Sequence, residues 1–156
     1  MNKQNEPAKG RLLVVSGPSG VGKGTVLAEL LKRSDDYAYS VSATTRAPRQ
    51  GEIDGKNYFF KTRGEFEKMI ENDELLEYAE YNGNYYGTPK KFVNELTARG
   101  KNVILEIEVQ GAMKVKARCP EAVMIFIAPE SKEILRERLY GRGTESEAVI
   151  NGRIAI

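Results

Sequence analysis

Hydrophobic and polar positions along the chain follow two periods, one typical of buried strands and one typical of amphipathic helices. Three short runs are apolar at most positions, as in strands covered on both faces of a parallel sheet: residues 12–15, 102–106 and 122–128. Between them, apolar side chains recur every three or four residues, which predicts helices. These are expected from the end of a glycine-rich turn to about residue 33, and over residues 88–100, 109–118 and 131–140. The alternation predicts an α/β fold with a parallel sheet flanked by helices.

The middle of the chain has a different pattern, with shorter apolar runs and more polar residues. A strand is predicted over residues 37–42, and residues 43–57 have prolines and glycines without a period, which indicates a loop carrying basic groups. Short strands are expected at 58–60, 75–81 and 84–86, the last two joined by an Asn82-Gly83 turn. Thr62 and Glu65 have the spacing of a capping box for a helix between them.

This pattern predicts a core domain interrupted by a small insertion. The core is expected to comprise residues 11–42 and 88–140, and the inserted α+β domain residues 43–87. Residues 1–10 are polar and are expected to be a disordered lead-in. Residues 141–156 are expected to begin a further segment beyond the core.

The glycine-rich turn after the first strand, SGPSGVGKGT at residues 16–25, predicts a phosphate-binding loop. Its glycines permit the tight curvature that points backbone N–H groups at an anion, and the following helix presents its positive end to the same place. Lys23 adds a full charge that reaches the outer phosphates of a nucleotide. The P-loop motif has Ser or Thr directly after the lysine, but Gly24 stands there and the hydroxyl follows at Thr25. The usual hydroxyl ligand for Mg²⁺ is therefore missing.

Composition excludes several classes of function. At 156 residues with 29% charged side chains, the chain suits one soluble globular domain. Its net charge of +2 argues against a general nucleic-acid-binding protein. With no histidine and only Cys119, His-based acid–base catalysis, the common His-containing zinc sites and an internal disulfide are excluded. Because neither a secretory signal nor a membrane-spanning run is visible, a cytoplasmic protein without membrane contact is expected.

Basic and phenolic side chains in the insertion are candidates for a second anion site. Arg46 and Arg49 are three residues apart, so both guanidinium groups can converge on one phosphate. Tyr58 and Tyr86 can add phenolic donors to the same anion. The alternative is that the tyrosines pack the core of the insertion and the arginines are merely solvated.

Two acidic residues, Glu77 and Glu108, are candidates for recognising a purine base. An ionised carboxylate only accepts hydrogen bonds, so it suits a partner with donors along one edge. Guanine offers N1–H and N2–H₂ side by side, whereas adenine presents a bare acceptor at N1. A carboxylate wall therefore favours guanine, although spacing alone leaves other interpretations open.

Several blocks of sequence together make the chain resemble guanylate kinases, which belong to the nucleoside monophosphate kinase group of P-loop kinases. The blocks occur in the order found in that family, between Arg11 and about Arg153: GPSGVGKGT, SVSATTRAPRQGEIDGKNYFF, NYYGTP, LEIEVQGA and RLYGRGTES. The resemblance implies transfer of the γ-phosphoryl group of ATP to GMP, which gives ADP and GDP. It implies Mg²⁺ with ATP as cofactor and small-molecule partners only; it leaves the oligomeric state open.

The resemblance also implies roles for individual residues. The guanine would be contacted by Ser42, Glu77, Thr88 and Glu108. The phosphate of GMP would be held by Arg46, Arg49, Tyr58 and Tyr86. The phosphates of ATP would be held by Gly17, Pro18, Ser19, Gly20, Val21, Gly22, Lys23, Gly24 and Thr25. The catalytic cations would be Lys23, Arg46 and three arginines around a mobile lid, Arg138, Arg142 and Arg153. Residues 141–156 would be the start of this lid and of the helix that follows it.

The resemblance departs from the family at the metal and at the end of the chain. With Gly24 after the lysine, Mg²⁺ is expected to be held by phosphates and waters, with Glu106 as the candidate to hold one of these waters. Family members continue for several dozen residues beyond the position of Ile156, and Gly152 stands where a basic helical residue is expected. We expect an intact GMP half, with ATP affinity and turnover reduced or absent in this polypeptide.

Two other functions remain open on the sequence. One is a non-catalytic guanylate-kinase-like module that binds partner proteins, although such modules typically lose the phosphate loop that this chain retains. The other is a P-loop kinase for a different acceptor nucleotide, which Glu77 and Glu108 disfavour.

Overall fold

The computed structural model describes residues 8–142 together with residues 147, 150 and 151. Its first sheet has the strand order β2-β7-β1-β8, and every neighbouring pair is parallel. The four strands are β1 (Leu12–Ser16), β2 (Tyr37–Tyr39), β7 (Asn102–Glu106) and β8 (Val123–Phe126). In the register of the central strand, Val14 lies between Leu105 and Met124. The predicted parallel sheet is thus confirmed.

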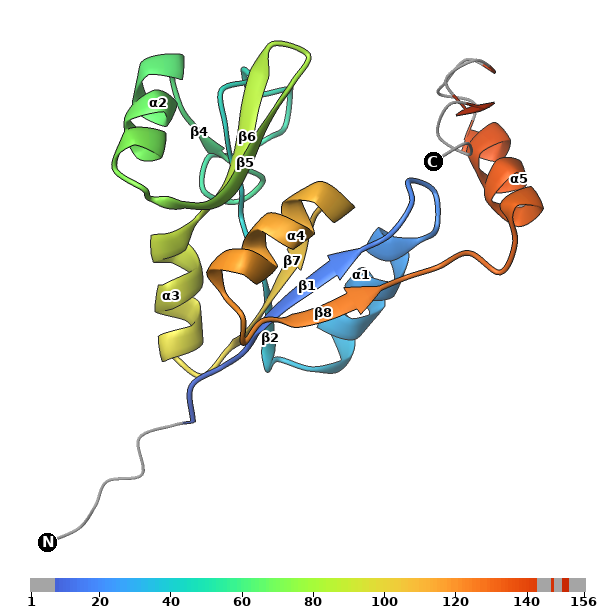
Figure 1. Cartoon of the computed structure of the whole chain (residues 1–156), viewed down its shortest axis with the longest axis horizontal. Helices are drawn as coiled ribbons and strands as arrows, with labels where there is room; N and C mark the ends of the chain where they lie inside the picture. Colours follow the sequence, from blue (N-terminus) through green and yellow to red (C-terminus); the bar gives the residue numbers. More distant parts are fainter. Residues whose placement is uncertain (1–7, 143–146, 148–149, 152–156) are drawn as a thin grey trace, which may run out of the picture.

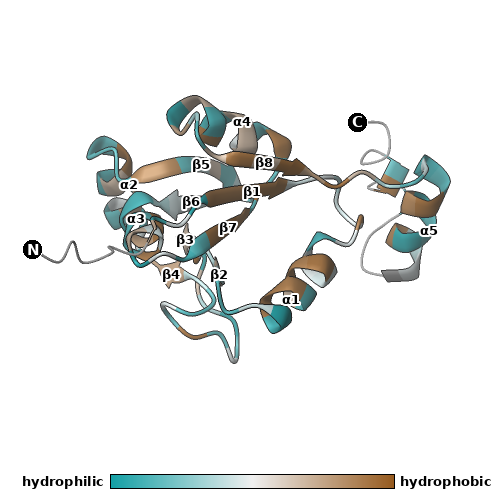
Figure 2. Ribbon diagram, turned by 90° about the horizontal axis from the view of Figure 1, so that it is seen from below, coloured by the Kyte–Doolittle hydropathy of each residue, from teal (hydrophilic) through white to brown (hydrophobic). Residues whose placement is uncertain are grey.

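Helices cover both faces of this sheet, as the apolar character of its central strands requires. Figure 2 shows α1 (Lys23–Arg33) on one side of the sheet and α4 (Val109–Arg118) on the other. Towards α1, the core consists of Val15, Leu27 and Ile104. On the opposite face, the larger core also takes in α3 (Lys90–Ala98) and consists of Val14, Leu76, Val93, Val103, Leu105, Ala112, Val115 and Ala122.

The prediction of a buried strand is wrong for β8. Its four side chains are 37–61% exposed, because β8 is the edge strand of the described sheet and has β1 on one side only. Past β8, the chain leads to α5 (Lys132–Arg142), which begins where the Ser131 hydroxyl accepts a hydrogen bond from the Ile134 backbone N–H. Figure 1 shows α5 standing apart from the helices that flank the sheet. No helix among the described residues is long and apolar enough to cross a membrane.

A second sheet, built from residues 43–89, has the order β4-β3-β6-β5. Its strands are β3 (Ala43–Thr44), β4 (Phe59–Phe60), β5 (Leu75–Tyr81) and β6 (Asn84–Pro89). The helix α2 (Arg63–Glu71) packs on it through Phe66, which is completely buried against Ala43 and Leu75. Figure 1 shows this sheet and α2 grouped above α3, next to the first sheet.

Two local predictions in this part of the chain are confirmed. Thr62 and Glu65 form the capping box of α2, since each side chain accepts a hydrogen bond from the other residue's backbone N–H. Asn82 and Gly83 join β5 to β6 with φ angles of 49° and 74°. Positive φ at both central positions gives the turn the twist that a two-residue hairpin needs.

Three predicted boundaries are wrong, and each error has a tertiary cause. The strand expected over 37–42 ends at Tyr39, and Ala43–Thr44, expected in a loop, forms β3 in the other sheet. The strand expected over 84–86 continues to Pro89, because Pro89 pairs with Leu75. Pro89 is consequently the N-cap of α3, so the helix expected from residue 88 begins at Lys90.

Candidate active site

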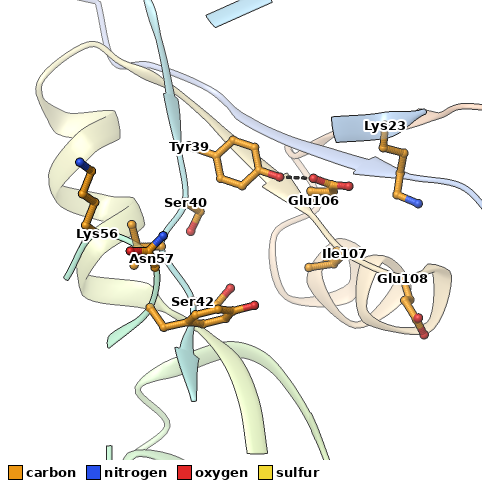
Figure 3. A pocket seen from close by; sticks show the side chains of 11 residues that line it. Lys23, Tyr39, Ser40, Ser42, Lys56, Asn57, Glu106, Ile107 and Glu108 are labelled. Carbon is orange, nitrogen blue, oxygen red and sulfur yellow. Dashed lines mark hydrogen bonds between the residues drawn. The ribbon is translucent and has the colours of Figure 1, made fainter. Parts of the chain in front are cut away.

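A cleft of about 400 Å³ lies at the carboxyl ends of β2 and β7, where parallel sheets commonly bind ligands. Three stretches of chain line it, residues 39–42, 56–58 and 106–108, and Lys23 closes it from the start of α1. Because the chain between β2 and β3 passes from one sheet to the other, its residues form the wall between them. Figure 3 shows the lining side chains.

The glycine-rich turn between β1 and α1 has the curvature predicted for it. Gly17, Gly20 and Gly22 have φ angles of 151°, 88° and 99°, which other residues adopt only with strain. A Cβ on Gly17 would also lie 2.3 Å from the carbonyl oxygen of Ile127, so glycine lets the turn approach the end of β8. The turn therefore brings the start of α1, where the helix dipole favours an anion, to the end of the sheet.

Two cationic side chains are fixed at this turn. The Lys23 ammonium donates to the carbonyl oxygens of Gly17 and Pro18, at 2.6 and 3.1 Å. Arg138 reaches the turn from α5 and donates from Nη1 to the carbonyl oxygen of Val21 at 3.0 Å. The structure thus brings together two of the predicted catalytic cations.

The other predicted residues near the turn are placed as follows. Gly24 has open space around it, and Thr25 is exposed on the first turn of α1. Arg142 is the last residue of α5, while Arg153 and Gly152 lie outside the described residues. Near the other end of the chain, the Gly10 backbone N–H donates a hydrogen bond to the Thr97 carbonyl oxygen. The last residue of the expected disordered lead-in is therefore bound to the end of α3.

Arg46 lies in a cluster that the sequence predicted only in part. Its Nη1 and Nη2 form a two-point ion pair with Glu52, with N···O distances of 3.0 and 2.8 Å. The guanidinium carbon is 5.4 Å from the centre of the Tyr58 ring. The Tyr58 and Tyr86 rings meet edge to face at 6.1 Å. Three of the four residues predicted for a phosphate therefore gather at one place.

Glu52 is a member of this cluster that sequence reasoning missed. Besides pairing with Arg46, its Oε2 accepts a hydrogen bond from the backbone N–H of Arg49 at 2.7 Å. These contacts lower the pKa of the Glu52 carboxyl, first of all the hydrogen bond from Arg46. The Arg49 side chain is exposed. The sequence signal for Glu52 was its position three residues after Arg49, the second arginine of the predicted phosphate site.

Glu77 is buried, with 9% of its surface exposed, on the strand β5. Its Oε1 accepts a hydrogen bond of 2.7 Å from the hydroxyl of Thr88, which is fully buried on β6. Burial raises the pKa of the Glu77 carboxyl, while the hydrogen bond from Thr88 and the charge of Lys114 oppose the shift. The structure thus brings together two of the residues predicted to contact a base.

The remaining two residues predicted for the base lie on the cleft wall. Ser42 stands between β2 and β3, and Glu108 is the residue immediately before α4. Figure 3 shows both side chains at the cleft, with Glu108 at the start of the helix. Glu108 is exposed, unlike Glu77.

Glu106 lies in the same cleft, at the carboxyl end of β7, and has a partner that the sequence did not reveal. The Tyr39 hydroxyl donates a hydrogen bond to the Glu106 carboxylate, drawn as a dashed line in Figure 3. Partial burial, followed by this contact with Glu106, raises the pKa of the Tyr39 hydroxyl. A carboxylate held beside Lys23 suits Mg²⁺, which prefers oxygen ligands and keeps several waters. No group of three or more metal-ligating side chains occurs among the described residues.

Comparison with known proteins decides the family. Residues 9–156 match the family model described as guanylate kinase. The chain belongs to the guanylate kinase family. The guanylate kinase of Halalkalibacterium halodurans is 62% identical over 151 residues, which are 97% of this chain and 74% of that protein. That of Streptococcus thermophilus is 60% identical over 147 residues, covering 94% of this chain and 70% of the relative.

A solved guanylate kinase has the same fold. The crystal structure of guanylate kinase from Anaplasma phagocytophilum superposes with a TM-score of 0.65 at 38% sequence identity, over 95% of this chain and 73% of that one. The α/β core with its phosphate loop is therefore that of a nucleoside monophosphate kinase.

Proposed function

We propose that this chain binds GMP in the cleft between its two sheets and transfers to it the γ-phosphoryl group of ATP bound at the phosphate loop, which yields GDP and ADP. The observation that carries the proposal is that Lys23 lines the same cleft as Ser42, Tyr58 and Glu108. A donor-side cation and candidate acceptor-side residues thus surround one space. Transfer between two bound nucleotides requires this proximity.

The acceptor site is proposed to recognise GMP at both of its ends. The buried carboxylate of Glu77 would accept the N1–H and N2–H₂ donors of guanine, with Thr88 fixing one carboxylate oxygen. Ser42 and Glu108 would complete the base site from the cleft wall. At the other end, Arg46, Tyr58 and Tyr86 would hold the phosphate, and Arg49 would join them from its exposed position.

The chemistry follows from charge and alignment. The phosphate of GMP is already a nucleophile, so it needs no general base to attack the γ-phosphorus of ATP in line. Lys23 and Arg138 stand at the phosphate loop, where they would stabilise negative charge on the transferring group. Mg²⁺ bound with ATP would neutralise further phosphate charge, and Glu106 is the carboxylate placed to hold one of its waters.

Separate titrations of GMP, AMP and ATP by calorimetry test this proposal. GMP should bind, and AMP should bind far more weakly because its N1 acceptor faces a carboxylate. Equal affinity for GMP and AMP would contradict the assigned base site. ADP formation that depends on GMP would distinguish a kinase from a non-catalytic binding module, whereas ADP formed equally without GMP would contradict GMP as the acceptor.

A further inference from the structure

A close approach between α4 and the buried carboxylate of Glu77 stands out beyond the site already described. A Cβ built on Gly111 would lie 3.3 Å from Glu77 Oε2 and 3.4 Å from Ile107 Cδ1. The first distance is tighter than most Cβ contacts in proteins, so a side chain there would require the carboxylate to move by a few tenths of an ångström. The lack of a side chain at Gly111 therefore sets where Oε2 can lie.

Local helix stability gives no reason for glycine at this position. Gly111 is the third residue of α4 and has no left-handed φ that would require glycine. Glycine is among the least favourable residues within a helix, because it loses more backbone entropy than alanine on ordering. Gly64, the second residue of α2, differs because a Cβ there would meet nothing within 4 Å. The described helices thus have three first-turn glycines, Gly24, Gly64 and Gly111, and only at Gly111 would a Cβ meet a carboxylate.

The two oxygens of Glu77 have different surroundings. Oε1 accepts the hydrogen bond from Thr88, whereas Oε2 faces Gly111 in the first turn of α4. The positive end of a helix favours a negative charge beside it, which opposes the penalty of burying the carboxylate. Lys114, further along α4, adds a favourable charge. The carboxylate is thus held between a hydroxyl on β6 and the amino end of α4.

We propose that Gly111 is a specificity-determining residue of the base site: by lacking a side chain, it leaves Glu77 Oε2 where the donors of guanine can reach it. The inference rests on the proposed function, since it assumes that GMP binds at Glu77. A methyl group at residue 111 would push Oε2 away from the base while leaving the phosphate cluster around Arg46 untouched. Its effect should therefore fall on recognition of the base.

The test compares Gly111→Ala with the matched control Gly64→Ala in titrations of GMP and IMP. IMP has the N1–H donor of GMP but lacks its 2-amino group, so the ratio of the two affinities reports alignment of the carboxylate with both donors. Gly111→Ala should weaken GMP binding about tenfold and IMP binding clearly less, since a displaced charged acceptor loses one of two hydrogen bonds. Gly64→Ala should leave both affinities unchanged, and both variants should melt cooperatively.

A double-mutant cycle separates this role from a general effect on α4. If Gly111 acts through Glu77, Gly111→Ala should have little further effect on GMP binding in a Glu77→Gln background. An equal effect in both backgrounds would overturn the inference, as would wild-type GMP affinity in Gly111→Ala. A Gly111→Ala protein without a cooperative melt would also overturn it, because the added methyl group is expected to move the Glu77 carboxylate and to leave the fold intact. Failure of the unmodified chain to bind GMP would instead contradict the proposed function.

Discussion

Replacing Glu77 with glutamine should remove the preference for guanine while leaving the shape of the site intact. Glu77 is 9% exposed, so water cannot take over the hydrogen bonds that the carboxylate would make with the base. Glutamine can still accept from the Thr88 hydroxyl, but its amide then presents a donor where guanine also presents donors. Hydrogen bonds to a charged group contribute about 1.5–3 kcal/mol, which corresponds to a loss of about 10- to 100-fold in GMP affinity.

Calorimetric titration of the Glu77→Gln variant with GMP and with ATP provides the measurement. GMP should bind more weakly by the factor given above, while ATP affinity should stay the same, because Glu77 lies on β5 and the ATP phosphates are expected at the turn between β1 and α1. An equal loss for both nucleotides would refute the reasoning, since it would indicate a general disturbance of the fold.

The same variant should also change how stability depends on pH. Burial raises the pKa of Glu77 above its ordinary value of 4.5 in the folded protein. The stability linked to its proton is therefore fully present below the unfolded-state pKa and is lost as the pH rises through the higher folded-state value. Glutamine does not titrate, so urea denaturation should show the variant gaining stability relative to the unmodified chain as the pH rises from about 4, near the pKa of an ordinary carboxyl, towards neutrality. A difference that stays constant with pH would contradict the burial argument.

Three further predictions concern other parts of the molecule. Glu52→Ala should lower GMP affinity severalfold, because the Arg46 guanidinium loses the two contacts that hold it in place for the phosphate. Guanosine lacks the phosphate, so its affinity should not change; an equal loss for both ligands in titration would contradict this. Gly20→Ala should weaken ATP binding and lower stability by about 1–3 kcal/mol in denaturation. Its φ is 88° and a Cβ would lie 2.8 Å from Leu139 Cδ2; unchanged stability would exclude this strain. Asp73→Asn should destabilise the fold at neutral pH only, because Lys90 and Arg118 lower the pKa of the Asp73 carboxyl and so stabilise its ionised form in the folded protein. The same loss of stability at acidic and neutral pH would contradict this.

Much of the fold could be predicted because local patterns and tertiary structure agree in the first sheet. The strand at residues 102–106 and the helix at 109–118 have the predicted bounds, since an apolar run and a helical period mark them clearly. The split at Tyr39 could not be predicted. Residues 37–44 read as one strand and a loop, but the partners of Ala43–Thr44 come from β4 and β6, which lie far along the sequence.

The candidate site could be predicted where a residue type implies chemistry, but not where a residue acts through its neighbours. Arg46 and Glu77 were singled out for their charge. Tyr39 and Gly111 were missed because their importance comes from distances to other side chains, which no spacing in the sequence encodes. Glu52 was missed although it stands three residues after Arg49, because only the structure shows that it pairs with Arg46. The resemblance to a family supplied the functional roles, while the structure supplied these supporting contacts.

A crystal structure of the chain soaked with GMP tests the central claim most directly. The edge of the guanine ring that carries N1–H and N2–H₂ should lie against the Glu77 carboxylate, with the nucleotide phosphate at Arg46, Tyr58 and Tyr86. A ring bound away from Glu77, or a phosphate held elsewhere than at this cluster, would contradict the assignment of the cleft as the GMP site.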